Sequence, residues 1–366
     1  MQNKERYALL VLLRAGLWEK QPDELSCFSL GNEGWDGVFR LARQQTVTGL
    51  AFQGLQYLPS GLLPPEPLLM RWAAAVEMIE RSNRKMEQVL AGLVAMFQSE
   101  GLNPVLQKGQ GVARFYEHPL LRECGDIDFY FSGQTARDKA LSCVQQARVR
   151  TTQMPDHSVC YQWKGVCVEH HSCLLDLSSP FLQRMARRME ETWGYVRCPL
   201  SGVEVSVPAP FLNLLLLDLH ILKHALGRGI GLRQLCDMAR ACHCLHDELS
   251  ADEMKTACVR LGLGRWNPLL HAFLVDCLGL PTDSLPYPER AASAAPLLDI
   301  VWRGGNFGQH LAGRRERDAR STWMRKWQTC QSFLHNVGFS CRYAPKETFW
   351  MMARLSGGQL LSFTGC

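Results

Sequence analysis

The stretch that most constrains the fold of this 366-residue chain is Arg122–Phe131, in which two aspartates lead into a β-prone aromatic run. Asp126 and Asp128 are separated by one apolar residue. Because successive side chains of a strand point to opposite faces, these two carboxylates should share a face. The alternate residues, Ile127, Phe129 and Phe131, should then enter a core. Paired carboxylates on one strand face can hold one or two Mg²⁺ ions, which take oxygen ligands.

An Asp-x-Asp pair arises by chance about once in a chain of this size, so its neighbours matter. Upstream, the short apolar run Pro104–Gly111 is broken by a Lys-Gly turn. Downstream, the β-prone run Val166–His171 carries Glu169 and His171 on one strand face. A strand, a glycine turn, a strand with paired aspartates and a strand with a third acid form the layout of a metal-dependent phosphoryl-transfer centre.

On these residues the chain resembles the nucleotidyltransferase superfamily of the polymerase-beta type. More closely, it is similar to an uncharacterised bacterial nucleotidyltransferase family with a Lys-Gly, Arg, Asp-Ile-Asp pattern, over roughly residues 5–280. The resemblance implies a metal- and nucleotide-binding transferase that uses Mg²⁺ (or Mn²⁺) and an NTP such as ATP. Lys108-Gly109 stands where a Gly-Ser or Gly-Gly pair is usual, and the gap to Asp126 is longer than usual.

Nucleotidyl transfer needs clustered carboxylates to hold metal ions. Asp126 and Asp128 are predicted to bridge metal, and Glu169 is predicted to be the third catalytic acid and metal ligand. The alternative for Glu169 is an exposed strand residue without a role. His170 should face the opposite side of its strand and be structural.

Four further residues are predicted to bind the nucleotide. Gly109 lets backbone amides approach phosphate, and Lys108 adds a positive charge there. Arg122 could form a bidentate contact with phosphate oxygens, and His171 could orient Glu169 or contact the triphosphate. The alternatives are a solvated loop lysine at 108 and a structural salt bridge at Arg122.

A second group of polar residues lies further along the chain. His220 and His224 are four residues apart on one predicted helix, and Arg233 and Asp237 are four apart on the next. The same run occurs in the resembled family. We expect His220, His224 and Arg233 to form one wall of the nucleotide-binding cleft, with a structural network between helices as the alternative.

Two other motifs favour a structural interpretation. Cys242–His246 has metal-like spacing, but on a helix Cys244 turns away from Cys242 and His246, and no second pair at zinc-type spacing follows. The segment 313–326 is basic and could meet a polyanion, although a solvated helix face is the more common reading.

Bulk properties describe an ordinary globular protein, with 46% hydrophobic and 20% charged residues. The net charge of +5 permits an anionic substrate, so nucleic acid is possible but not indicated. The fifteen cysteines form no regular framework and follow no convincing secretory signal, which predicts reduced thiols in a cytoplasm. The most apolar run is too short to span a bilayer, so no membrane segment is expected.

The predicted fold class is α+β, with a small mixed β-sheet nucleotidyltransferase core, a helical N-terminal cap and a C-terminal helical bundle. The expected domains are an N-terminal cap at 1–101, the core at 102–207, a helical substrate-binding region at 208–280 and a helical extension at 281–366. The last strand, at 203–207, is predicted to be an edge strand. Predicted helices occupy 4–20, 34–57, 67–100, 135–147, 180–191, 210–226, 230–246, 251–261, 265–278, 289–302 and 319–336.

The sequence therefore predicts an enzyme that moves NMP from an NTP to an acceptor hydroxyl or phosphate. A small molecule, a protein hydroxyl and an RNA end all fit as the acceptor. The alternative is a catalytically silent or toxin–antitoxin-type regulatory binding module on the same fold. Intact residues at 126, 128 and 169 argue against degeneration. A zinc-dependent function is a more distant alternative.

Overall fold

The computed structural model describes residues 2–154, 156–227, 229–304 and 336–353. The chain forms two compact units. Unit 1 contains residues 1–43, 47–174 and 192–216, and unit 2 contains residues 44–46, 175–191 and 217–366. Among the described helices, none is both long enough and apolar enough to cross a membrane.

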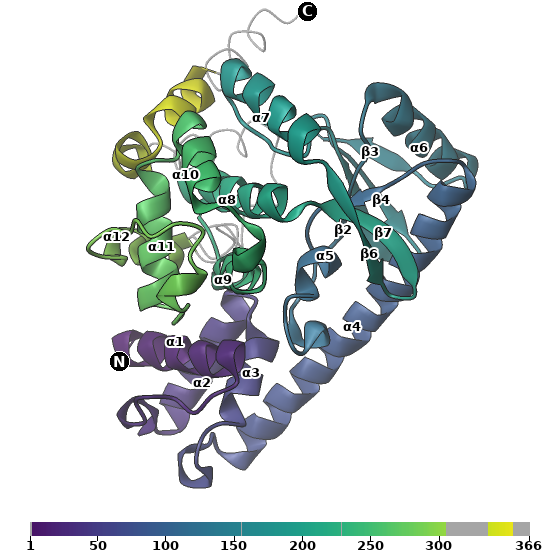
Figure 1. Cartoon of the computed structure of the whole chain (residues 1–366). Helices are drawn as coiled ribbons and strands as arrows, with labels where there is room; N and C mark the ends of the chain where they lie inside the picture. Colours follow the sequence, from purple (N-terminus) through teal and green to yellow (C-terminus); the bar gives the residue numbers. More distant parts are fainter. Residues whose placement is uncertain (1, 155, 228, 305–335, 354–366) are drawn as a thin grey trace, which may run out of the picture. The chain divides into compact units, whose positions relative to one another are not determined.

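Within the described part of the chain, unit 1 contains one seven-stranded sheet with the order β3-β4-β5-β2-β1-β7-β6 (Figure 1). Strand β2 runs antiparallel to β1 and parallel to β5, so the sheet is mixed. Together with the helical N- and C-terminal regions, this confirms the predicted α+β class. The strands are β1 (Val105–Leu106), β2 (Ile127–Tyr130), β3 (Thr151–Gln153), β4 (Val159–Trp163), β5 (Val166–His171), β6 (Tyr195–Leu200) and β7 (Val203–Pro208).

The alternation predicted for the Asp-Ile-Asp segment is confirmed on its apolar side. Ile127, Phe129 and Phe131 are almost fully buried in the core of unit 1. The long helix α4 (Glu66–Ser99) packs on that core with Met86, Val89, Leu90, Leu93, Val94 and Phe97, a spacing that places them on one helix face. Helix α6 (Gln134–Gln146) adds Ala140 and Val144 to the same cluster. This sheet face is therefore occupied, and polar chemistry is confined to the other.

The N-terminal helices of unit 1 follow the predicted pattern with one difference. The segment predicted as one helix over 34–57 is two helices, α2 (Asn32–Gln44) and α3 (Thr48–Leu55), after α1 (Gln2–Trp18). The break occurs at Thr46, whose φ of 53° is incompatible with a continuous right-handed helix. The predicted stop after α4 is confirmed, because Gly101 has a φ of +71° and its N–H donates to Gln98 O.

The prediction of an edge strand at 203–207 is wrong. Strand β7 lies inside the sheet between β1 and β6, and β6, which was not predicted, forms the edge. A two-residue turn at Ser201-Gly202, with positive φ at both, joins the pair. Pro199 in β6 weakens the strand signal in the sequence, yet proline is tolerated on an edge strand because its missing N–H can face outward.

Unit 2 is helical in the part of the chain that is described. Its helices begin near the predicted positions, except that the helix expected at 289–302 begins at Ala295. The helix expected at 319–336 lies outside the described residues but for its last one. Helices α7 and α8 contribute to both units; the helices are α7 (Pro180–Trp193), α8 (Pro210–Leu226), α9 (Leu232–Leu245), α10 (Ala251–Arg260), α11 (Trp266–Asp276) and α12 (Ala295–Gly304).

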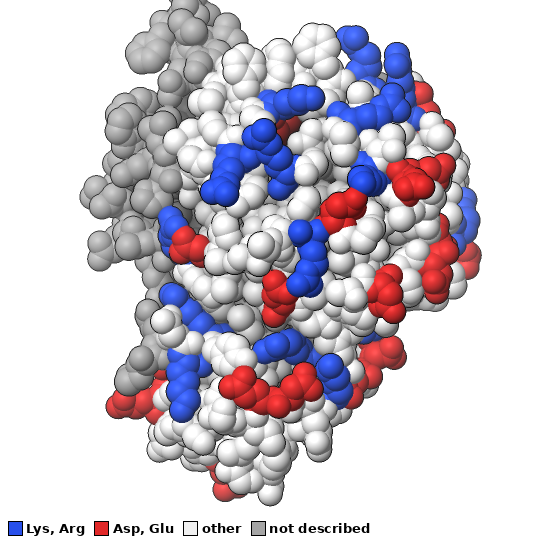
Figure 2. Space-filling view, turned by 60° about the vertical axis from the view of Figure 1, so that its left-hand side comes forward, with Lys and Arg blue, Asp and Glu red and all other residues white. Residues whose placement is uncertain are grey.

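Basic and acidic side chains are interspersed on the face drawn in Figure 2, consistent with the modest net charge of +5. Every cysteine that the structure describes is a free thiol.

Candidate active site

The turn after β1 brings a lysine to the sheet. The Gln107 N–H donates to Asp128 O at 3.0 Å and continues the ladder between β1 and β2. Gly109 follows with a φ of +57° and a ψ of −119°, a conformation that favours glycine. The Gly111 N–H then donates to Lys108 O, beginning the four-residue helix α5 (Gln110–Ala113). Main-chain hydrogen bonds on both sides of Lys108 therefore fix the position of its backbone, from which the side chain extends.

The parallel pairing of β2 with β5 places two predicted carboxylates side by side. Asp128 is the direct register partner of Glu169, and Tyr130 is that of His171. Side chains of directly paired residues lie on the same sheet face. Because β5 alternates, Glu169 and His171 both point to the face opposite the core, as predicted.

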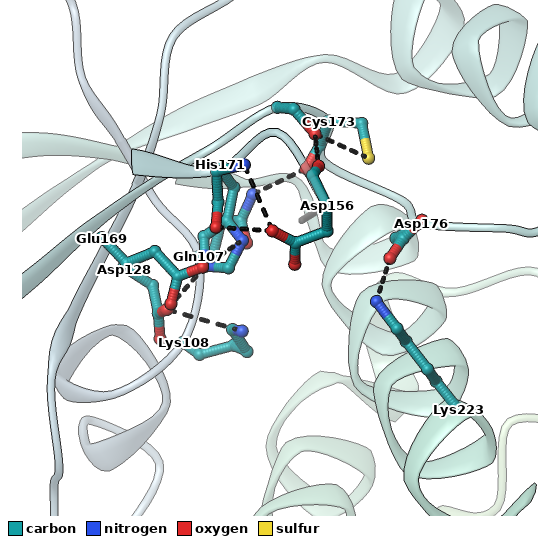
Figure 3. A network of polar contacts seen from close by, with 11 residues as sticks. Gln107, Lys108, Asp128, Asp156, Glu169, His171, Cys173, Asp176 and Lys223 are labelled. Atoms are coloured by element: carbon teal, nitrogen blue, oxygen red, sulfur yellow. Dashed lines mark hydrogen bonds and ion pairs between the residues drawn. The ribbon is translucent and has the colours of Figure 1, made fainter. Parts of the chain in front are cut away.

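The His171 ring approaches both carboxylates (Figure 3). Its Nε2 is 2.6 Å from Asp128 Oδ1, and its Nδ1 is 3.7 Å from Glu169 Oε1. The Lys108 Nζ approaches the same Asp128 oxygen to 3.6 Å. Asp128 thus has two basic partners on one oxygen and an acidic neighbour on the next strand.

Opposing effects act on the charge of Asp128. Burial alone would raise the pKa of its carboxyl group, but the charge of Lys108 and the hydrogen bond and charge of His171 outweigh burial and hold that pKa well below its usual range. Asp128 is therefore an ionised acceptor, and Nε2 of His171 carries the hydrogen that is donated to it. The side chain of Asp128 is only 6% exposed, which makes its charge expensive without such partners.

Three ligand atoms of this site fit a metal ion. One atom each from Asp128, Glu169 and His171 lies within 4.8 Å of the other two. The two carboxylate oxygens suit a hard divalent cation such as Mg²⁺ or Mn²⁺ and supply the opposite charge, and the imidazole nitrogen is a ligand more typical of transition-metal ions than of Mg²⁺. We refer to these three residues as the carboxylate cluster. Its residues fit the metal that the sequence predicts.

Asp126 lies next to the cluster without being one of its three members. It precedes β2, and its main-chain oxygen would be 3.1 Å from a Cβ at Gly109. Burial, and after it the charge of Asp126, raises the pKa of the Cys167 thiol, which lies on β5 two residues before Glu169. The charge of Asp126 is therefore close enough to act on Cys167, and its role as a bridging ligand stays a prediction.

Arg122 and His170, the remaining residues of unit 1 with predicted roles, lie in different environments. Arg122 is 5% exposed, and its Nη1 is 3.4 Å from Glu123 O and 3.1 Å from Cys124 Sγ. His170 is buried on the core face, as predicted, where its Nε2 is 2.9 Å from the Tyr161 hydroxyl. Burial lowers the pKa of His170 to about 3, so it is neutral in the folded protein. The phosphate contact of Arg122 stays a prediction.

The predicted wall residues belong to unit 2. His220 and His224 stack edge to face on α8, with ring centroids 4.5 Å apart, and both are half-buried. Arg233 is half-buried in the first turn of α9. Their proposed place beside the carboxylate cluster, which belongs to unit 1, stays a prediction.

Cys242–His246 shows no sign of a metal site. Cys242 is fully buried, Cys244 is exposed and His246 Nδ1 is 2.8 Å from His243 O. Among the described residues, the carboxylate cluster is the one group of three metal-ligating side chains close enough to hold an ion. The basic segment 313–326 lies outside the described residues.

Sequence reasoning missed the contact between Lys108 and Asp128. A lysine beside a glycine turn was interpreted as a phosphate ligand or as a solvated loop residue, yet its side chain is only 15% exposed. The antiparallel register of β1 and β2 brings the two together, and no local pattern specifies that register.

Comparison with known proteins shows the family to which the chain belongs. None of the curated proteins compared with the chain matches it. A crystal structure of an antigenic nucleotidyltransferase-like protein from Paracoccidioides brasiliensis is similar at 14% identity and a TM-score of 0.31, over 55% of this chain and 92% of that one. A TM-score of this size supports no inference about activity. The model of a family described as uncharacterised nucleotidyltransferases matches residues 31–277, more than half of the chain and all of the carboxylate cluster, so the chain belongs to this family.

Proposed function

We propose that the protein is a metal-dependent nucleotidyltransferase that moves NMP from an NTP to an acceptor hydroxyl or phosphate. The acceptor oxygen forms a bond to the α-phosphorus while the bond from that phosphorus to the oxygen bridging the α- and β-phosphates breaks. Pyrophosphate leaves, and the proton of a hydroxyl acceptor passes to water. The observation that carries the proposal is the convergence of Asp128, Glu169 and His171 within 4.8 Å in a member of a nucleotidyltransferase family.

The cluster residues would hold Mg²⁺ or Mn²⁺, which when bound neutralises negative charge that develops on the phosphates. Asp128 suits this role because its carboxyl group is ionised although the side chain is buried. Glu169 is the register partner of Asp128 and supplies the second carboxylate. Asp126 precedes the same strand and is proposed to extend the metal-binding face toward Gly109.

The nucleotide is proposed to bind next to these carboxylates. Lys108, Gly109 and Arg122 are candidates for the triphosphate, because Lys108 and Gly109 lie beside Asp128 and Asp126, and Arg122 precedes the same strand in the chain. From unit 2, His220, His224 and Arg233 are candidates for contacts to base, sugar or acceptor. A helical wall is needed because orientation of the acceptor supplies much of the rate of such a transfer.

Three finer assignments belong to the same proposal. The fold is proposed to be of the polymerase-beta type, from the bacterial branch that the sequence resembles. The domain boundaries at residues 101, 207 and 280 are proposed to separate four segments with different roles, which are the N-terminal cap, the nucleotidyltransferase core, the substrate-binding region and the C-terminal extension. A cytoplasmic location is proposed because the described cysteines are free thiols.

The proposal is tested by following a label placed at either of two phosphates of the NTP. The protein is incubated with each NTP, labelled at either the α- or the γ-phosphate, with Mg²⁺ or Mn²⁺ and a cell extract. We expect α-label to enter an acceptor and γ-label to leave in pyrophosphate. Asp128→Asn should reduce incorporation by at least a hundredfold.

A matched control is Asp283→Asn, which changes an exposed aspartate of unit 2. Transfer of γ-label alone would identify a phosphotransferase instead. Absence of α-label transfer from every NTP, with intact binding of a nucleotide, would favour the silent binding module.

A further inference from the structure

We propose that Lys108 is the resident counter-cation of Asp128 in the metal-free protein and is displaced from that carboxylate when a divalent metal binds. This inference rests on the proposed function, because it assigns the cluster to a metal. It explains how the charge of Asp128 is balanced before a metal ion binds and how metal binding to the carboxylate cluster is regulated.

The first step is the shared ligand atom. The Lys108 Nζ is 3.6 Å from Asp128 Oδ1, the same oxygen that accepts from His171 Nε2. Asp128 is a member of the only described group of side chains that could hold a metal. An ammonium group and a divalent cation repel each other, and both are attracted to this oxygen.

The second step is burial. The side chains of Lys108 and Asp128 are 15% and 6% exposed, so water screens their attraction only weakly. A buried carboxylate without a compensating charge is costly. Lys108 supplies part of that compensation at the oxygen that a divalent ion would bind, so the ion must displace the ammonium group from Asp128.

The backbone of Lys108 is held in place on both sides. The Gln107 N–H donates to the main-chain oxygen of Asp128 itself, and the Gly111 N–H donates to Lys108 O. The Gln107 side chain is also fixed, because its Nε2 donates to Cys173 O at 3.2 Å (Figure 3). The root of the lysine side chain is thus anchored beside Asp128, while its flexible end can move away.

The consequence is an exchange of cations. In the metal-free state the site contains the charge of Lys108, and in the loaded state the divalent ion replaces it. The released ammonium group remains tethered beside the cluster, where it can meet the phosphates of a nucleotide. Lys108 therefore opposes metal binding and supports nucleotide binding, two effects of opposite sign from one residue.

The test measures metal binding directly. Mn²⁺ affinity is determined by calorimetry or electron paramagnetic resonance for wild type, Lys108→Met, Asp128→Asn and Lys255→Met. Lys255 is the matched control, since it forms an ion pair with Glu289 on unit 2. We expect Lys108→Met to bind Mn²⁺ about tenfold more tightly, Lys255→Met to match wild type and Asp128→Asn to lose binding.

Unchanged or weaker Mn²⁺ binding by Lys108→Met, with normal binding by wild type, would overturn this inference and leave the proposed function standing. Failure of both proteins to bind Mn²⁺, with or without an NTP, would overturn the proposed function as well.

A second measurement uses the wild-type protein and so does not depend on how the variant folds. Acetylation of lysines by a small reagent is quantified by mass spectrometry with and without saturating Mn²⁺. Labelling of Lys108 should rise severalfold when Mn²⁺ binds, while that of Lys255 stays constant. Lys108 labelling that is unaffected by bound Mn²⁺ would contradict displacement.

Discussion

His171 Nε2 lies 2.6 Å from Asp128 Oδ1, and this hydrogen bond joins two neighbouring parallel strands, β5 and β2. The same ring presents Nδ1 to Glu169 Oε1 at 3.7 Å. Two carboxylates that would repel each other thus share one imidazole, whose two nitrogens each approach one of them. The site is built around this ring as much as around the acids.

Removing the ring should therefore weaken metal binding. His171→Ala deletes one of three ligand atoms and frees Asp128 and Glu169 to move apart. We expect Mn²⁺ affinity to fall by about 10–100-fold, the size typical when a ligand or its orienting partner is lost. The control is His157→Ala, an exposed loop histidine. Equal Mn²⁺ affinities of wild type and His171→Ala would remove His171 from the site.

Gly109 should be intolerant of a side chain. Its φ of +57° is strained for alanine, and a Cβ there would approach Asp126 O to 3.1 Å. Gly109→Ala should lower the free energy of unfolding by roughly 1–3 kcal/mol, measured by urea denaturation. Gly92→Ala is the matched control, because Gly92 lies in α4 with nothing near its Cβ position and should stabilise by roughly 0.5–1 kcal/mol. A stable Gly109→Ala protein would show that this turn is not constrained.

Asp218 should make the stability of the protein depend on pH. It is fully buried in α8 and accepts a hydrogen bond from Trp266 Nε1 at 2.6 Å. Burial raises its pKa to about 7, although hydrogen bonds from Trp266 and Asn267 oppose the rise. A folded-state pKa above the unfolded value contributes stability that is fully present below about pH 4 and is lost as the pH rises through 7.

Asp218→Asn keeps an acceptor for Trp266 and removes the charge. The variant should gain stability relative to wild type between pH 5 and pH 8, by at most about 4 kcal/mol at roughly 1.4 kcal/mol for each pKa unit. Thermal melts across this range measure the difference, with exposed Asp283→Asn as control. A difference in Tm that does not vary with pH would show that Asp218 is ionised throughout.

Arg233 distinguishes a binding wall from a structural network. If it contacts the nucleotide or acceptor, Arg233→Ala should lower transfer at least tenfold with a Tm close to that of wild type. If it is structural, Tm should fall by several degrees. Arg260→Ala, at an exposed arginine on α10, is the control for loss of a positive charge. Unchanged transfer and an unchanged Tm would exclude both roles.

The face of the carboxylates could be predicted from sequence because it depends on a local rule. Alternation along a strand places Ile127 and Phe129 in the core, and it places Glu169 and His171 together on the other face. The turn at Lys164-Gly165, which joins β4 and β5, also depends on local geometry, since both residues have the positive φ that a tight hairpin turn requires.

What could not be predicted depends on pairing between distant segments. The approach of Lys108 to Asp128 requires the antiparallel register of β1 and β2, and the bridge made by His171 requires the parallel register of β2 and β5. No local sequence pattern specifies either register. Strand β6 was missed for another reason, because Pro199 and Arg197 suit an exposed edge better than a typical strand.

The most direct measurement is anomalous diffraction from crystals grown with MnCl₂ and a non-hydrolysable NTP analogue. We expect an anomalous peak at about 2.0–2.3 Å from carboxylate oxygens of Asp128 and Glu169, with the Lys108 ammonium group moved off Asp128 toward the phosphates. A Mn²⁺ peak bound elsewhere, with the hydrogen bond between His171 and Asp128 and the contact of Lys108 unchanged, would contradict it.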